Sequence, residues 1–189
     1  MNDNSLSILS REIDKYIMQS PYPEDPIHSL NTLEWLLKLM PDADEMLRIA
    51  ARGHDIEHAD DERRVSASSF TSYDEYKEAH ARNSAVVLSE IMLDFDMDKQ
   101  FIEDVGLLVA SHETGGTTRA DVLMHADVLS FFHVSLPLYL DRKGVDTTWR
   151  RMIWSYKKLP FALRKEVGEM GYIDEQLQAL VTDLIRNDF

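Results

Sequence analysis

Apolar side chains recur every three or four positions along most of this chain, which is the spacing of one buried helix face. The first such segment contains five of them: Leu6, Leu9, Ile13, Tyr16 and Ile17. The same spacing predicts further helices at residues 28–40, 43–57, 74–95, 98–111 and 119–140. Three shorter helices are predicted in residues 146–189. Because no strand-like alternation of useful length is present, the pattern predicts an all-α fold, a single-domain helical bundle.

Turn-forming residues separate these segments. Pro41 ends the second predicted helix, Pro137 interrupts the one at 119–140, and Gly115-Gly116 forms the clearest break in the middle of the chain. Residues 60–72, DDERRVSASSFTS, are charged and Ser-rich without a clear period, which predicts a surface loop. We find no internal repeat and no low-complexity tract, so one domain over residues 1–189 is expected.

The composition is that of an ordinary globular protein. The chain has 189 residues, 44% of them hydrophobic and 29% charged, which is enough for one well-packed core. It has no cysteine, so disulfides, thiolate metal sites and cysteine nucleophiles are all excluded. This agrees with a cytoplasmic location. No apolar run approaches the ~20 residues of a membrane span, and the polar N-terminus lacks the layout of a signal peptide.

The net charge of the chain restricts the classes of molecule that it can bind. With 34 acidic and 20 basic residues, the formal net charge is −14, which repels a polyanionic backbone and argues against a nucleic acid polymer as partner. A small phosphorylated substrate stays compatible with this charge if bound metal ions supply local positive charge. A homodimer is also compatible, because helical domains with apolar C-terminal helices often pair.

Imidazoles and carboxylates, the side chains that hold first-row divalent metals, occur at six positions on or at the ends of predicted helices. They are His28, His54, Asp55, His80, His112 and Asp127. A helical bundle can point such side chains at one centre, and the two oxygens of Asp55 suit it to bridge two ions. Individually, the histidines have simpler roles open to them: a helix cap, a hydrogen-bonded core residue, or a partner for a helix dipole. Asp127, in an apolar helix, is costly to bury unless it is paired or bound to metal.

The residues that flank these six positions strengthen the prediction of a metal site. Residues 50–58, AARGHDIEH, are similar to an HDIGH-type motif, with Glu57 in place of glycine. Residues 80–85, HARNSA, 108–113, LVASHE, and 126–129, ADVL, are similar to three further family elements. In this order the chain resembles the six-ligand variant of the HD superfamily of metal-dependent phosphohydrolases. The resemblance covers about residues 25–140, and residues 146–189 are expected to pack on that motif core.

The resemblance implies one or two divalent ions. The first ion would be held by His28, His54, Asp55 and Asp127, and the second by Asp55, His80 and His112. Relatives with one metal use only the first set, so His80 and His112 could instead contact substrate. Mn, Fe, Co, Ni, Zn or Mg are all open as the metal.

Other residues are candidates for roles around the metal. The predicted helix puts His58 on the same face as His54 and Asp55, and His58 aligns with the last histidine of the HDIGH-type motif, so it either touches substrate or supports a ligand. Glu57 and Glu113 could orient an imidazole or assist proton transfer, although solvated glutamates are the simpler interpretation.

Cationic contacts to a phosphate are harder to assign. Lys77 and Arg119 are candidate substrate-binding residues, with ordinary surface cations as the favoured alternative. Pairing on the helix surface is expected for Arg150-Arg151 and Lys157-Lys158. The aromatic residues are expected in the core: Phe131, Phe132, Trp149, Trp154 and Tyr156.

The resemblance implies hydrolysis of a phosphate ester, most simply of a nucleotide or another small phosphorylated molecule, by metal-activated water. Asp55 would bridge and hold the nucleophile, and His58 or a neighbouring acid would help the leaving group. Two alternatives remain open. A branch that resembles inositol oxygenase uses the same six ligands for a di-iron centre, and a non-catalytic domain could bind a nucleotide or partner at the inherited site.

Overall fold

The computed structural model describes residues 3–187, and within that range it is helical with no strand, which confirms the all-α prediction. The first six helices are α1 (Asp3–Ile17), α2 (Asp25–Leu39), α3 (Glu45–Gly53), α4 (Tyr73–Asp94), α5 (Lys99–Ala110) and α6 (Thr118–Ser130). The C-terminal part contains α7 (Leu136–Lys143), α8 (Val145–Tyr156), α9 (Phe161–Glu169) and α10 (Glu175–Asn187). The short turns are η1 (Ile56–Ala59), η2 (Ala67–Ser69) and the π-helical η3 (Phe131–Ser135).

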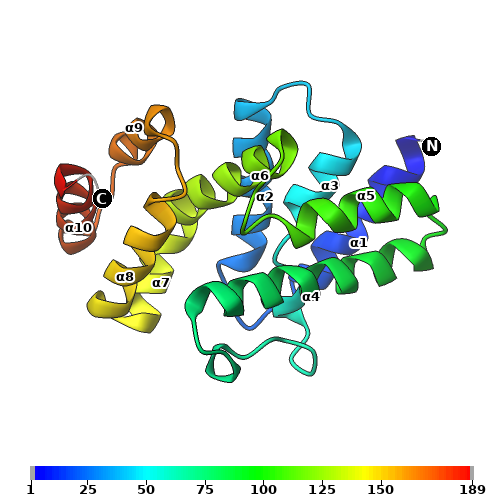
Figure 1. Cartoon of the computed structure of the whole chain (residues 1–189), viewed down its shortest axis with the longest axis horizontal. Coiled ribbons are helices and arrows are strands. Elements are labelled where there is room, and N and C mark those ends of the chain that lie inside the picture. Colours follow the sequence, from blue (N-terminus) through cyan, green and yellow to red (C-terminus); the bar gives the residue numbers. More distant parts are fainter. Residues whose placement is uncertain (1–2, 188–189) are drawn as a thin grey trace.

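The helices form two connected parts (Figure 1). In the N-terminal part, α4 packs along α5 and α2 packs along α6, and α3 contacts both α2 and α5. Helices α7 and α8 lie on the other side of α6, with α9 and α10 beyond them. One continuous hydrophobic cluster runs from Leu9 and Ile13 in α1 to Val181 and Leu184 in α10. The chain is therefore one domain with one core.

Small residues let α3 approach its neighbours closely. Ala50 and Ala51 are fully buried, and a Cβ built on Gly53 would lie only 2.8 Å from the Cδ2 atom of Leu88 on α4. The side chain of Asp44 accepts a hydrogen bond from the Leu47 amide at 2.9 Å and so caps the start of α3. This packing fixes the position of the residues that follow Gly53.

The prediction of one continuous helix over residues 43–57 was wrong. Helix α3 ends at Gly53, and His54 and Asp55 lie in a turn before η1. One physical reason is Gly53 itself, because glycine weakens a helix. The second is the buried Glu57, which forms hydrogen bonds with His80 of α4 and with Val65 of the next loop, and these compete with continuation of the helix.

The loop predicted at residues 60–72 is confirmed as irregular apart from η2. It is fastened to the core by hydrogen bonds, because Asn83 of α4 donates to the Arg63 carbonyl at 2.7 Å and the Val65 amide donates to the buried Glu57 at 2.9 Å. The following helix α4 begins with a capping box, in which Ser72 and Glu75 each bind the other's backbone amide. This long helix carries Lys77, His80 and Asn83 to the centre of the protein.

Helices α6, η3 and α7 form one continuous helical stretch, Thr118–Lys143. The predicted interruption is the π-helical turn η3, directly before α7, where Pro137 occupies the first turn. Proline has no amide to donate to the preceding turn, and a wider turn accommodates it. By length and composition this stretch could cross a membrane, so the expectation that no segment qualifies was wrong. However, 56% of its apolar window is buried inside the protein, as in the core helix of a soluble protein.

Candidate metal centre

Four side chains from separate parts of the chain meet as a first group. His28 lies in the first turn of α2, His54 and Asp55 follow α3, and Asp127 lies on α6. The Nε2 atom of His28 is 3.0 Å from Oδ1 of Asp127 and 3.1 Å from Nε2 of His54, and 3.7 Å from Oδ2 of Asp55. All four donor atoms lie within 4.8 Å of one another, so they could hold one ion.

A second group shares Asp55 with the first. His80 on α4 places Nε2 2.7 Å from Oδ1 of Asp55, and His112, which follows α5, places Nε2 3.6 Å from the same oxygen. These three side chains also satisfy the geometry of a metal site. Because Oδ2 of Asp55 faces the first group and Oδ1 faces the second, this carboxylate can bridge two ions. The two groups coincide with the two ligand sets implied by the HD resemblance.

Hydrogen bonds to backbone carbonyls and to a hydroxyl orient three of the four imidazoles. Nδ1 of His54 and Nδ1 of His112 face the carbonyl oxygens of Ala51 and Val109 at 2.9 and 2.7 Å, and a carbonyl can only accept. Nδ1 of His28 lies 2.9 Å from the hydroxyl of Ser130, which donates its own hydrogen to the His28 carbonyl. In the neutral imidazole the proton therefore lies on Nδ1, and Nε2 directs its lone pair at the centre.

The environment of these lone pairs fits a bound cation. The Nε2 atoms of His28 and His54, both lone-pair donors, face each other at 3.1 Å inside the protein. Nε2 of His112 is buried and makes no hydrogen bond within the described part of the chain. Buried polar atoms without a partner are costly, and a divalent ion would satisfy all of them at once. Imidazole and carboxylate ligands without sulfur suit Mn, Fe, Co, Ni and Zn.

The carboxylates carry the negative charge that such ions need. Burial alone would raise the pKa of Asp55, but His54 and His80 hold it well below its usual range. The pKa of Asp127 is also lowered against the effect of burial, by its contacts with His28 and His54. Both side chains are therefore ionised. Burial lowers the pKa of His112, but nearby Asp55 and Glu113 raise it to about 9, a measure of how anionic this centre is.

Glu57 supports the second group, so its interpretation as a solvated glutamate was wrong. It is fully buried, and its Oε1 lies 2.7 Å from Nδ1 of His80. Its Oε2 accepts hydrogen bonds from the Asn83 side chain at 2.5 Å and from the Val65 amide at 2.9 Å. All three partners donate to this carboxylate, which fixes the His80 ring and its tautomer.

Glu113 is likewise buried rather than solvated, with 5% of its surface exposed. It forms ion pairs with Lys77 of α4 and with Lys158, which follows α8 and lies 2.5 Å away. Lys77 is only 6% exposed, which corrects its interpretation as a surface cation. Arg119, in contrast, pairs with Asp44 at 2.6 Å and does not line the central cavity, so the structure does not bring it to the metal groups.

His58 lies beside the second group in η1, and not on a continuation of α3. Its ring stacks on that of His80 with centroids 4.8 Å apart, and its Nδ1 lies 3.2 Å from Oδ2 of Asp25. Burial lowers the pKa of His58, but Asp25 and Asp55 raise it above its usual value. This histidine can hold a proton at the edge of the metal groups.

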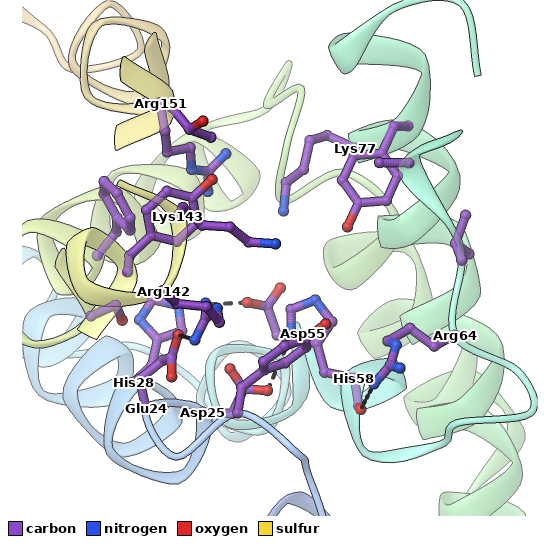
Figure 2. A pocket seen from close by; sticks show the side chains of 18 of the residues that line it. Glu24, Asp25, His28, Asp55, His58, Arg64, Lys77, Arg142, Lys143 and Arg151 are labelled. Atoms are coloured by element: carbon purple, nitrogen blue, oxygen red, sulfur yellow. Dashed lines mark hydrogen bonds and ion pairs between the residues drawn. The ribbon is translucent and has the colours of Figure 1, made fainter. Parts of the chain in front are cut away.

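A cavity of about 700 Å³ opens over the metal groups (Figure 2). His28, Asp55, His58 and Asp127 lie in its wall, as do the aromatic residues Tyr22, Tyr73, Tyr76, Phe131 and Tyr139. Five cations also line it: Arg64, Lys77, Arg142, Lys143 and Arg151. Five carboxylates line it as well, so that this cavity, in a protein of net charge −14, balances cations and acids in number: Glu24, Asp25, Asp55, Asp61 and Asp127.

Comparison with known families adds one finding. Residues 11–181 match the domain of unknown function DUF4202. The chain belongs to the DUF4202 family. Neither the curated proteins nor the solved structures include a significant match to it. The DUF4202 region extends from α1 into α10, so it includes α7 and α8 and the cavity cations that they carry.

Sequence reasoning missed four of these cations in the DUF4202 domain: Arg64, Arg142, Lys143 and Arg151. Arg151 had been interpreted as a helix-surface residue, which was wrong. A partial signal was present, because Ser135, Tyr139 and Arg142 recur at helical spacing and all three line the cavity. The spacing could not reveal that this polar face turns towards the metal groups.

Proposed function

We propose that this DUF4202 domain is a metal-dependent phosphohydrolase that acts on a nucleotide or another small phosphate ester. One observation carries the proposal: two ligand groups share Asp55, and this residue lies with His28 and Asp127 in the wall of a cavity that five cations also line. Imidazoles and a bridging carboxylate suit paired divalent ions, and the cations suit an anionic substrate. The resemblance to the HD superfamily supports the same reaction.

Each side chain has a definite role in this proposal. When bound, divalent ions would supply a nucleophilic water at neutral pH and offset charge on the phosphoryl oxygens. Asp55 holds the ion-binding centre together from both sides, and Glu57 keeps Nδ1 of His80 protonated so that Nε2 stays a ligand. His58, with its charged form stabilised by Asp25, would donate a proton to the leaving oxygen.

The cavity cations explain how an acidic protein admits an anion. Electrostatic repulsion from the net charge of −14 acts at long range, but screening limits it to about 10 Å at moderate salt. Inside the cavity, Lys77 and the four arginine and lysine side chains around it are closer to the substrate than most surface carboxylates. The cavity wall also has five carboxylates, two of them the metal-group residues Asp55 and Asp127, so bound divalent ions would give the cavity the positive charge that favours a phosphate.

The test is hydrolysis by protein loaded with manganese, measured on a panel of nucleotides and small phosphate esters. We expect release of phosphate or of a phosphorylated product, and complete loss of activity in Asp55→Ala together with loss of bound metal. His133→Asn is a suitable control, because His133 belongs to neither metal group and its side chain is exposed. Fully loaded protein that hydrolyses no phosphoester would refute the proposal.

A second variant separates proton transfer from metal binding. His58→Asn should keep both ions, because His58 is in neither of the two groups that share Asp55. Its turnover should fall by about 10²–10⁴-fold, the usual contribution of a general acid. The loss should be smallest for substrates with an acidic leaving group, such as a nitrophenyl phosphate. An equal loss for all leaving groups would assign His58 to substrate binding instead.

A di-iron oxygenase is the second candidate, because the same four imidazoles and two carboxylates suit two irons. Metal analysis of protein purified without added metal distinguishes the two. About two irons per chain and oxygen consumption with a polyol or an organophosphonate would favour the oxygenase. For either reaction we propose a cytoplasmic location, consistent with the absence of cysteine and with the burial of the one long apolar helix.

A further inference from the structure

The five cavity cations differ in whether a carboxylate neutralises them. Arg142 pairs with Glu24, Lys77 pairs with Glu113, and Arg64 lies 2.9 Å from Asp61. Lys143 and Arg151 form no ion pair with any carboxylate of the described residues. The cavity therefore has two positive charges for which the protein itself offers no direct counter-charge.

Arg151 is held in place by aromatic rings rather than by acids. Its guanidinium donates a hydrogen bond to the Tyr73 hydroxyl at 2.7 Å and lies 5.0 Å from the ring centroid of Phe131 and 4.7 Å from that of Trp154. Trp154 is in turn fixed by a hydrogen bond of 2.7 Å from its Nε1 to Asp74. Cation–π contacts orient a guanidinium without cancelling its charge, so Arg151 is preorganised for an external anion.

Lys143 reaches the same space from the neighbouring helix. It is the last residue of α7, and Gly144, with a φ of 73°, turns the chain directly into α8. Thr147 and Arg151, four residues apart on α8, also line the cavity and so share one face. In Figure 2, Lys143 and Arg151 lie on the side of the cavity opposite Lys77, and both point into it.

The size of the cavity leaves room for more than one anionic group. Its volume of about 700 Å³ is within the range of roughly 300–1,000 Å³ that is usual for sites of whole small molecules. A phosphate at the metal groups would lie beside Asp55 and Asp127, whereas Lys143 and Arg151 belong to α7 and α8 on another wall. The two regions can therefore bind two separate groups of one ligand.

We propose that Lys143 and Arg151 form a second anion subsite, which binds a further phosphate group of the substrate away from the metal ions. This rests on the proposed phosphohydrolase function and narrows its substrate class to molecules with at least two phosphate groups. It also gives the C-terminal helices, which lie outside the HD resemblance, a role in substrate selection.

The test measures binding without turnover. Calorimetry on manganese-loaded protein compares inorganic phosphate with imidotriphosphate, an inorganic triphosphate that resists hydrolysis. We expect the triphosphate to bind more tightly, and Lys143→Gln and Arg151→Gln each to weaken its binding by about 10-fold or more, as expected for loss of a charge-assisted hydrogen bond. Phosphate binding should change less than twofold.

Controls keep the result interpretable. Arg150→Gln removes the same charge from the adjacent exposed position and should change neither affinity. Lys143 is exposed, so Lys143→Gln is expected to fold and tests the subsite by itself if Arg151→Gln unfolds. Equal weakening for both probes, or no weakening for either, would overturn the subsite. A selective loss in a protein that hydrolyses no phosphoester would leave the subsite standing and refute only the proposed function.

Discussion

Glu57 offers the sharpest test of the metal centre, through the substitution Glu57→Gln. This change keeps the size of the side chain but replaces one acceptor oxygen by an NH₂ donor. Three groups now donate to the carboxylate: Nδ1 of His80 at 2.7 Å, the Asn83 amide at 2.5 Å and the Val65 backbone amide at 2.9 Å. Glutamine can accept on one side only, so one set of partners must face a donor.

Both arrangements of the new amide damage the second ligand group. If the amide nitrogen faces His80, the ring must move its proton to Nε2, where the proton points at Asp55 and blocks metal binding. If it faces the other side, Asn83 and the Val65 amide lose their acceptor and the loop at residues 60–72 loosens. Loss of such a supporting carboxylate typically weakens metal binding by about 10–100-fold, or roughly 1.4–2.7 kcal/mol.

The effect should be confined to one of the two ion sites. Glu57 contacts His80, whereas the group of His28, His54, Asp55 and Asp127 makes no contact with Glu57 among the described interactions. A competition titration with a chelating dye should therefore show one unchanged ion and one weakened ion. The exposed Glu62, changed to Gln, is a matched control in the following loop. Equal weakening of both ions, or no change in either, would refute the assigned role of Glu57.

Two further predictions concern stability. Gly53→Ala should destabilise the fold by about 1–3 kcal/mol, because the new Cβ would lie 2.8 Å from the fully buried Leu88 side chain. Thermal unfolding should show this loss of stability. Gly171→Ala is the control and should leave stability unchanged, because the space around Gly171 is open. Removal of metal with a chelator should lower the melting temperature, since an ion at 100 times its Kd stabilises the folded state by about 2.7 kcal/mol. Asp55 belongs to both ligand groups, so a melting temperature of Asp55→Ala that still rises when metal is added would contradict both of them.

The sequence alone determined which segments are helical and which side chains bear metal chemistry. Apolar periodicity reports one buried face per helix, and it predicted the helices from α1 to α6 and the three in the last third with shifts of a few residues at their ends. Helix ends were less certain: the helix predicted over residues 43–57 is α3, which stops at Gly53, before His54. The order of histidines and aspartates also indicated a metal site, because few other roles require those residue types at all six positions.

Tertiary structure alone decided what surrounds that site. Periodicity describes a residue's own helix, and it contains no information on which distant charge will lie opposite. Glu57 and Glu113 are buried because His80, Lys77 and Lys158 meet them from α4 and from the chain after α8. Arg151 lies in the cavity because α8 packs beside it, whereas the helix surface of Arg119 turns towards Asp44. Pairing across such separations depends on how helices pack, and packing is a property of the whole chain.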